Sequence, residues 1–439
     1  MLLSLDIIPE ILLYATVIGL CFWLLYRRYI FSVADPLFIF IVTTTFASVL
    51  VVEAVDEPRN VIHYFVCQLC VWAGFALVQE RTGNAAVRAY AGSIQFTDLN
   101  LLRYTTYALF GIYLLSNLII LQTKGFALLS NDPSASKVTN FQEGFGIFRK
   151  VNWAVGGVVS AGLFFLFLLE KKRHLLILLL VVIFFSALGG SKGALLTYAV
   201  TAALFIYHPV FRTQHGLRQM LRKYIPVAVL AIFSVFFTVL IKENEDSEAV
   251  LLAFVRRLLY GADSVLFFYA PANVDYFARY SWLDFPAYIA NPILGFLRIA
   301  PYQEAFGNVM VENTLPPGVS MEVIVGPNSA FYTEGQVFFG YYGAFAYSFA
   351  LGCLASWVRA LFFGLQRGSA FLLVFLSVLY QFSAAFLVDV KLAIGQIFDA
   401  LVLVLPVYLV ICFVVNRKIV FRQVRFGSAG NADLLVNHG

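Results

Sequence analysis

Apolar stretches long enough to cross a lipid bilayer alternate with short polar segments along most of the chain. A membrane-spanning helix needs about 20 mostly apolar residues. The pattern predicts about eleven such helices, at residues 7–26, 37–52, 61–79, 104–122, 151–169, 175–188, 194–207, 225–241, 336–358, 368–388 and 395–415. The predicted fold class is therefore an all-α polytopic integral membrane protein.

Composition agrees with this class, and the basic residues predict an orientation. Hydrophobic residues make up 61% of the chain and charged residues only 13%, against about 25% charged in a soluble domain. Cytoplasmic loops of membrane proteins collect Lys and Arg. Alternate short segments of this chain collect Arg27, Arg28; Arg81, Arg88, Arg103; Lys171, Lys172, Arg173; Arg212, Arg218, Arg222, Lys223; Arg359, Arg367; and Arg417, Lys418, Arg422, Arg425. The N-terminus is therefore predicted outside and the C-terminus in the cytoplasm.

The opening segment and the net charge both follow from this topology. The first apolar run lacks a basic n-region and a small-residue cleavage site, so it is predicted as the first span and not as a signal peptide. The net charge of +5 is explained by the basic cytoplasmic segments. It gives no reason to expect a nucleic-acid partner.

Four regions follow from the span pattern. They are N-terminal spans in 1–241, a long outer loop in 242–335, C-terminal spans in 336–416 and a cytoplasmic tail in 417–439. Long loops are usually functional. Within this one, AVLLAFVRRLLYG has the apolar spacing of an amphipathic helix and is predicted to lie in the outer interface. The proline-broken stretch DFPAYIANPILGFLRIAP is predicted as a re-entrant segment.

Some kinds of chemistry are excluded or made improbable by what the chain lacks. No cytoplasmic loop is long enough for a nucleotide-sugar domain, and no GxxxxGK[ST] phosphate loop occurs. Any reaction is therefore expected on the outer side without nucleotide. Cys67 and Cys70 form a CxxC with no second pair, so all five cysteines are predicted as small apolar core residues. No metal and no cofactor are predicted.

Charged residues occur at three places where the pattern predicts membrane depth or its outer edge. Such residues are costly in a bilayer and often functional. They are Lys192 in SALGGSKGALLTY, Asp389 and Lys391 in FLVDVKLAIGQIF, and Arg256, Arg257 and Arg298 in the outer loop. Simpler explanations exist, because each could cap a turn, anchor an interfacial helix or reach the headgroups. Cations gathered on one side of the membrane would also suit a phosphate-bearing ligand.

Lys192 lies between two short apolar runs. Each run has about 14 residues and would extend about 21 Å as a helix, which is less than the roughly 30 Å hydrocarbon core. The turn that holds Lys192 is therefore predicted below the outer surface, inside protein. There the lysine would be a recessed cation at the floor of an outward-facing cavity.

Two outer acids are candidates for work on a hydroxyl group. Glu334 directly precedes the aromatic-rich span GQVFFGYYGAFAYSFALG, and Asp263 follows the amphipathic helix. Either carboxylate could position or deprotonate a hydroxyl. The sequence by itself does not choose between them.

Three motifs in a fixed order carry a resemblance to a known family. GGSKGALLTY, FLRIAPYQEAFGN and GPNSAFYTEGQVFFGYYGAFAYSFALG resemble motifs of the Wzy-type oligosaccharide repeat-unit polymerases. Arg257 in FVRRLLYGADSVL is similar to a basic position of that family, whereas Lys192 stands where many members have arginine. The resemblance covers roughly residues 186–352.

The resemblance implies a polytopic glycosyltransferase of the GT-C kind in the bacterial inner membrane. Two undecaprenyl-pyrophosphate-linked glycans would meet on the periplasmic face, and a sugar hydroxyl of the acceptor would attack the anomeric carbon of the donor. Undecaprenyl pyrophosphate would leave. The implied roles are pyrophosphate binding by Lys192, Arg257 and Arg298, with Arg256 and Lys391 in reserve; activation of the acceptor by Glu334 or Asp389; and sugar binding by Tyr332 and Asn328. A chain-length regulator is an implied partner.

Two other functions fit a membrane protein of this kind. An O-antigen ligase belongs to the same class but uses a histidine in its large outer loop, and none of the five histidines lies in 242–335. A flippase for lipid-linked oligosaccharides would have short loops on both sides, which disagrees with the long loop here.

Overall fold

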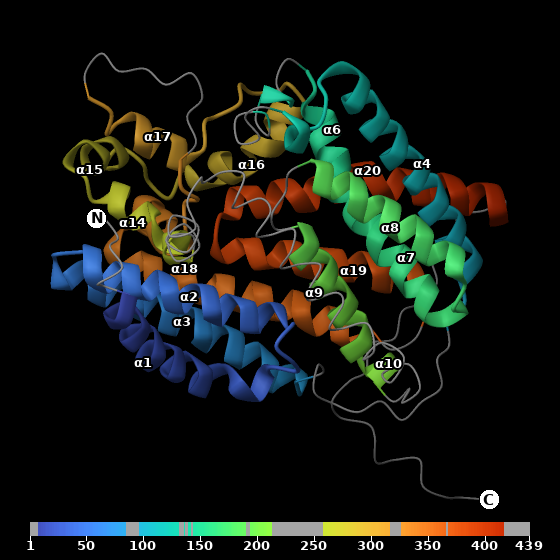
Figure 1. Cartoon of the computed structure of the whole chain (residues 1–439). Coiled ribbons are helices and arrows are strands. Elements are labelled where there is room, and N and C mark those ends of the chain that lie inside the picture. The colour runs from blue at the N-terminus through green and yellow to red at the C-terminus, as the bar shows by residue number, and fades with distance from the viewer. Residues whose placement is uncertain are drawn as a thin grey trace, which may run out of the picture.

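The computed structural model describes residues 8–84, 96–130, 136, 139–141, 144–189, 194–212, 258–316, 326–365 and 368–416 (Figure 1). Within these ranges the chain is helical, and the only β-type pairing is one isolated bridge between Phe96 and Gly368. Eight of the described helices are long and apolar enough to cross a membrane. The prediction of an all-α polytopic membrane protein is therefore confirmed.

Ten of the eleven predicted spans correspond to described helices, most of which extend beyond the predicted ends. The N-terminal part contains α1 (Ile8–Tyr26), η2 (Arg27–Tyr29), α2 (Pro36–Ala54), α3 (Pro58–Thr82), α4 (Leu99–Thr123), η3 (Ala127–Leu129), α6 (Gly146–Lys150), the π-helical turn η4 (Val151–Val155), α7 (Gly156–Glu170), α8 (Arg173–Leu188), α9 (Ala194–Tyr207) and α10 (Pro209–Arg212). The helices α8 and α9 are shorter apolar helices. The span predicted at 225–241 lies outside the described residues.

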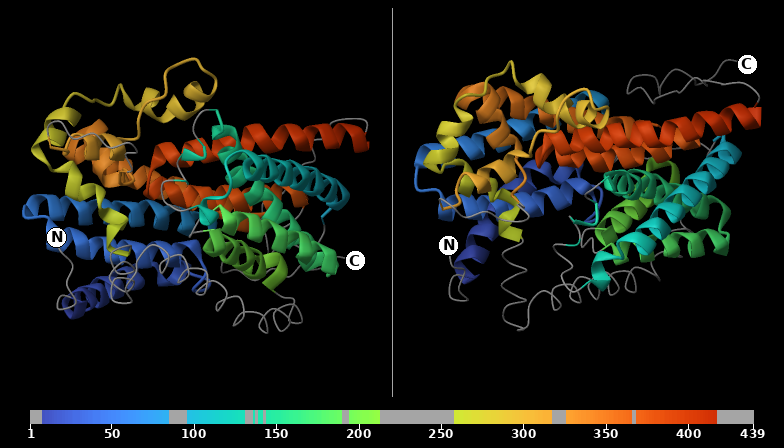
Figure 2. Two further views of the ribbon diagram at one scale, coloured as in Figure 1. Left: turned by 45° about the horizontal axis from the view of Figure 1, so that its top comes forward. Right: turned by 90° about the horizontal axis from the view of Figure 1, so that it is seen from above.

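The later part of the chain combines short helices with three long ones. It contains η5 (Tyr260–Ala262), α14 (Ser264–Phe268), α15 (Pro271–Phe277), α16 (Phe285–Phe296), α17 (Phe306–Glu312), α18 (Phe331–Gly364), α19 (Ala370–Ser383), η6 (Ala384–Leu387) and α20 (Val390–Asn416). The short helices α14 to α17 gather at one end of the bundle (Figures 1 and 2). We call this the outer end, following the orientation that the sequence predicts.

Helices α3 and α18 run side by side in the same direction. His63 contacts the backbone carbonyl of Tyr341 at 3.1 Å, and farther along both helices Gln79 donates to the side-chain oxygen of Ser356 at 3.0 Å. A methyl group at Gly74 would lie 2.1 Å from the carbonyl oxygen of Phe349. The two backbones therefore touch, as small residues permit in membrane helices.

Helix α18 folds back on itself near its start. Gly340 has φ 72° and ψ 179°, values that interrupt the helix. Residues 334 and 347 would lie about 20 Å apart in a continuous helix, yet the Tyr347 hydroxyl donates to the Glu334 carboxylate at 3.0 Å. The segment before Gly340 is thus a short half-helix packed against the segment that follows it. The sequence prediction of a simple span at 336–358 missed this turn.

Helix α16 lies along the first part of α20. A methyl group at Gly395 would be 3.4 Å from Pro292, and the rings of Phe296 and Phe398 are 5.8 Å apart. After Phe296 the chain turns and comes back, because Asn291 donates to the carbonyl of Pro301 at 2.9 Å and accepts from the amide of Gln303 at 2.9 Å. This descent and return has the shape expected of a re-entrant segment, whereas its depth in a bilayer stays a prediction.

A fully buried ion pair joins distant segments at the opposite, inner end. Both carboxylate oxygens of Asp35 accept from Arg359, at 2.6 and 2.8 Å, and neither side chain is exposed. Arg359 also donates to the carbonyl of Tyr29 at 2.7 Å and to the hydroxyl of Tyr380. The sequence explanation of Arg359 by topology alone does not account for this burial.

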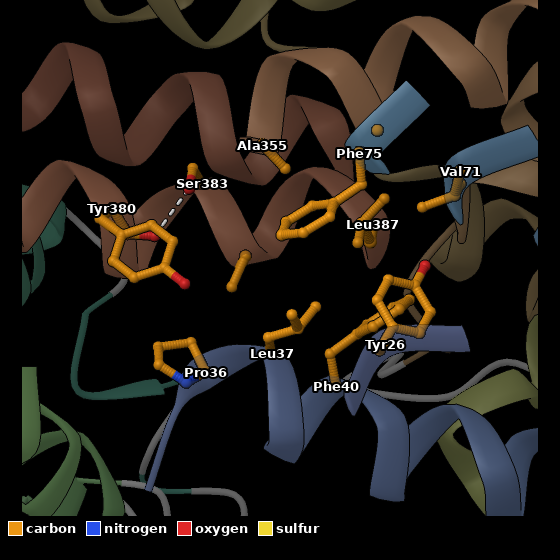
Figure 3. Close-up of a pocket in the computed structure, with 12 residues that line it drawn as sticks. Tyr26, Pro36, Leu37, Phe40, Val71, Phe75, Ala355, Tyr380, Ser383 and Leu387 are labelled. Carbon is orange, nitrogen blue, oxygen red and sulfur yellow. Dashed lines mark hydrogen bonds between the residues drawn. The ribbon is translucent and has the colours of Figure 1, made fainter. Parts of the chain in front are cut away.

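An apolar cavity lies beside the ion pair. It is enclosed by α1, α2, α3, α18 and the α19–η6 segment (Figure 3). The Tyr380 ring forms one end, with Leu37 and Phe75 along the sides, and the other lining residues are mainly hydrophobic. The cavity thus lies between the N-terminal helices and α19, and no charged residue lines it.

Candidate functional site

The carboxylate of Glu334 is the centre of a buried group of hydroxyls at the outer end. Tyr288 and Ser329 donate to one carboxylate oxygen at 3.0 Å each, and Tyr347 donates to the other at 3.0 Å. Glu334 is 0% exposed. The half-helix supplies the acid, α16 supplies Tyr288, and the helix after Gly340 supplies Tyr347. The fold-back of α18 is what brings these groups together.

Lys391 and Asp389 lie next to this group, at the start of α20. The ammonium of Lys391 donates to the carbonyl of Gln303 at 2.7 Å and lies 5.1 Å from the ring centroid of Tyr288. Asp389 accepts from the amide of Leu392 at 2.8 Å, so it caps the helix. Lys391 is 5% and Asp389 8% exposed. Asp389 directly precedes α20 and Lys391 lies in its first turn, and both side chains are buried. The binding and catalytic roles considered for them stay predictions.

The charges of this region are close enough to influence one another without direct pairing. Burial first, and then the negative charges of Glu334 and Asp389, raise the pKa of Tyr288 well above its ordinary value. Burial also raises the pKa of Asp389, while the amide of Leu392 and the charge of Lys391 oppose that shift. In the described part of the chain, no ion pair joins Lys391 to either acid. Their charges are therefore not neutralised by direct contact.

Two of the motifs that carry the family resemblance pack directly against each other. A methyl group at Gly307 would lie 1.5 Å from the carbonyl oxygen of Pro327, and one at Gly326 would lie 2.0 Å from the carbonyl oxygen of Gly307. Asn308 accepts from the Gly326 amide at 2.8 Å. Only glycine allows this approach, so FGN at 306–308 and GPN at 326–328 form one unit beside Glu334.

The other predicted site residues are placed differently. Arg298 is exposed, directly after α16, and has a left-handed φ of 57°. Asn328 is exposed. Tyr332 is buried, with its ring 4.8 Å from that of Tyr64 and its hydroxyl without a partner in the described residues. Sugar binding by Asn328 and Tyr332 stays a prediction.

Three cations that the sequence predicts for pyrophosphate binding lie outside the described residues. They are Lys192, Arg256 and Arg257, together with most of the predicted amphipathic helix. Their assignment to pyrophosphate binding stays a prediction. Asp263, which follows that helix, is half-buried beside η5, and Gly261 of η5 approaches Ala47 in the middle of α2. Burial raises the pKa of Asp263 to about 6.

Sequence reasoning missed a second charged group, which lies at the end of α6. Lys150 pairs with Asp399 at 2.6 Å, and the Asp399 side chain is 3% exposed. The ammonium of Lys150 also lies 5.1 Å from the ring centroid of Phe296, at the end of α16. The π-helical turn η4 follows at once, and such turns often occur at functional sites. The sequence did contain one signal for this group, because Asp399 is the single acidic residue inside the span predicted at 395–415.

The arrangement can bind an anion and hold hydroxyl groups. Lys391 offers a positive charge that no carboxylate contacts directly. Glu334 accepts from three neutral hydroxyls, so a fourth hydroxyl could replace one of them at little cost in hydrogen bonds. No group of three or more His, Cys, Asp or Glu side chains suited to a metal ion occurs among the described residues. No known protein family, curated protein or solved structure matches this chain.

Proposed function

We propose that this protein polymerises undecaprenyl-pyrophosphate-linked oligosaccharide repeat units on the periplasmic face of a bacterial inner membrane. One observation carries the proposal. The second and third motifs of the resemblance form a single packed unit through Gly307 and Gly326, and this unit borders Glu334. A sequence resemblance in separate segments gains weight when those segments make one site.

The electrostatics support a reaction in which negative charge develops on a leaving group. During glycosyl transfer, the bond between the anomeric carbon and the pyrophosphate oxygen breaks, and the departing pyrophosphate gains charge. A fixed cation that is not neutralised stabilises that state more than the ground state. Lys391, which is bonded to a neutral carbonyl, has this property. Arg298, Lys192, Arg257 and Arg256 are further cations of the proposal.

The acceptor hydroxyl needs a proton acceptor as it attacks. We assign this role to Glu334, with Asp389 as the second candidate. In the described arrangement Glu334 is enclosed, so the sugar hydroxyl would replace Ser329 or a tyrosine as donor. Ser329 lies in the non-helical segment before α18, and its hydroxyl is 3.3 Å from that of Tyr288, which can donate to the same carboxylate oxygen in its place. It is therefore the donor that is most easily exchanged.

The direct test uses purified full-length protein in bilayers and lipid-linked repeat units as the only substrate. We expect polymers of several repeat units and release of undecaprenyl pyrophosphate without added nucleotide. Absence of any elongation with an active, folded preparation would overturn the proposal.

A gene replacement in the native host separates the alternatives. Loss of a polymerase leaves a single repeat unit attached to the lipid core. Loss of a ligase removes all attached glycan, and loss of a flippase also removes it but leaves lipid-linked units on the inner side. Either of the last two results would replace the polymerase by the corresponding function.

A further inference from the structure

The turn between α15 and α16 presents two large apolar side chains at the outer end. Trp282 is 64% and Leu283 66% exposed. Asp284 closes the turn, because its amide donates to the carbonyl of Ser281 at 3.0 Å and its carboxylate accepts from the amide of Ser281 at 2.8 Å and from its hydroxyl at 2.9 Å. Trp282 and Leu283 are therefore held at the surface by a hydrogen-bonded turn.

The exposed side of α16 continues this apolar surface. Tyr288 and Asn291 are buried, and both use their polar groups in hydrogen bonds within the protein. Pro286 and Ala287 are exposed in the first turn of the helix and Phe296 at its end, and α16 contains no charged residue. A surface helix of a water-soluble domain has the opposite arrangement, with its charged and polar residues outward. The exposed side of α16 therefore suits contact with lipid.

Contacts between α16 and α20 set the level of this turn relative to a helix that can cross the membrane. The ammonium of Lys391, in the first turn of α20, lies 5.1 Å from the ring centroid of Tyr288, and Trp282 precedes Tyr288 by six residues. Helix α20 has 27 residues and is therefore about 40 Å long. This length is close to that of a bilayer with its headgroups, about 40–45 Å. The start of α20, and the turn that lies beside it, are thus expected among the lipid headgroups at the outer end.

We propose that the α15–α16 turn inserts Trp282 and Leu283 into the headgroup region of the leaflet at the outer end and so anchors α16 to the membrane surface. Tryptophan is enriched at this level of membrane proteins, because its ring is apolar while its indole N–H meets polar partners there. Lipid is favoured over a partner protein because the same apolar surface continues along α16, away from the headgroups. The anchor does not depend on the proposed function, since it requires only a membrane-embedded protein.

The test places the full-length protein in phosphatidylcholine vesicles and measures tryptophan fluorescence. The contribution of Trp282 is the difference in emission between the unchanged protein and Trp282→Phe. We expect strong quenching of this contribution by lipid that carries bromine high on its acyl chains, weaker quenching by lipid brominated near the chain ends, and little quenching by iodide in the water. Strong quenching by iodide without quenching by brominated lipid would overturn the proposal, because the turn would then lie in water.

Trp357 is the control for contact with the membrane. It is 53% exposed and lies within α18, which is long and apolar enough to cross a membrane. Brominated lipid should quench its contribution, measured with Trp357→Phe, whereas iodide should not. Protection of Trp282 from both quenchers would also overturn the proposal, since a partner protein or a second copy of the chain would then cover the turn.

A charge in the turn gives a second measurement. Leu283→Asp places a carboxylate beside Trp282, and a carboxylate is unfavourable in the apolar part of a membrane. In this variant, quenching of Trp282 by iodide should rise several-fold and quenching by brominated lipid should fall. Val274→Asp is the matched control, because Val274 is 46% exposed in α15, outside the turn, and should leave the quenching of Trp282 unchanged. Unchanged quenching of Trp282 in Leu283→Asp as well would overturn the proposed insertion.

Discussion

The inner and outer ends of the bundle both bury charged side chains, but they treat the charges differently. At the inner end Arg359 and Asp35 form a two-point ion pair, and each terminal nitrogen of the arginine donates twice. At the outer end Glu334 accepts only from neutral hydroxyls, and Lys391 donates to a neutral carbonyl. Opposite charges therefore meet directly in the Arg359–Asp35 pair, whereas Glu334 and Lys391 have no direct contact with an opposite charge among the described residues.

This difference teaches that burial by itself does not identify a functional charge. A fully paired ion in a low-dielectric interior has little capacity left for a ligand, although removal of one partner is costly. A buried charge that is hydrogen-bonded only to neutral groups can still attract a ligand or transition state of opposite charge. We therefore expect changes at the inner end to affect stability and changes at the outer end to affect activity.

The largest expected effect comes from Arg359→Met. The change leaves Asp35 buried without its cation, and breaking a buried pair in this way costs about 3–5 kcal/mol. Thermal unfolding in detergent should show a large fall in Tm. If the variant had the same Tm as the unchanged protein, the Arg359–Asp35 pair would not be important for stability.

A double variant sharpens this measurement. Asp35 also caps α2 by accepting from Leu37 at 2.9 Å, and asparagine keeps that capping ability without the charge. Arg359→Met with Asp35→Asn should therefore recover part of the lost stability. Additive losses would mean that the ion pair itself is not the source.

Glu334→Gln has the next largest effect, on activity. Glutamine keeps the shape but offers an NH₂ group to a site that contains three hydroxyl donors, and it cannot accept a proton from the acceptor sugar. We expect polymer formation to fall by about a hundredfold or more, with a far smaller change in Tm than for Arg359→Met. Full polymerase activity in this variant would remove Glu334 from the proposed reaction.

Gly340→Ala tests the fold-back that builds the outer group. The backbone of Gly340 lies in a region that is almost limited to glycine, and a side chain there costs about 1–3 kcal/mol. Activity should fall along with Tm, because Tyr347 and Glu334 separate when the turn opens. Gly111→Ala is a suitable control, since a methyl group there meets nothing within 4 Å. Equal Tm and equal polymer formation in the two variants would contradict the described turn at Gly340.

The smallest effect is expected from Asp263→Asn and depends on pH. Burial raises the pKa of Asp263 to about 6 in the folded protein, against about 4 in an unfolded chain. The folded state thus binds this proton more tightly, so its contribution to stability is present below about pH 4 and is lost as the pH rises to about 6. The variant should lose this dependence and be slightly more stable at pH 7. Parallel Tm profiles of both proteins from pH 4 to 8 would contradict the assignment.

The spans could be predicted because long apolar runs are a local property of the sequence. The two long-range ion pairs could not be predicted in this way. Arg359 and Asp35 are 324 residues apart, and Lys150 and Asp399 are 249 apart. Arg359 follows an apolar run, as a cytoplasmic basic residue also does, so position alone gave no sign of its burial.

The candidate site was predicted in part. Glu334, Asp389 and Lys391 were chosen from the sequence, and the structure places them close together. The turn at Gly340 could not be chosen, because the aromatic-rich stretch around it contains several glycines in similar surroundings.

The parallel packing of α3 and α18 has a consequence for the number of membrane crossings between them. Two helices that cross a membrane in the same direction must be separated by an odd number of other crossings. The long helix α4 and the span from α6 to α7 supply two between them, which is even. The sequence predicts three further spans between Glu170 and Phe331. With them the predicted total is five, which is odd and agrees with the parallel packing of α3 and α18.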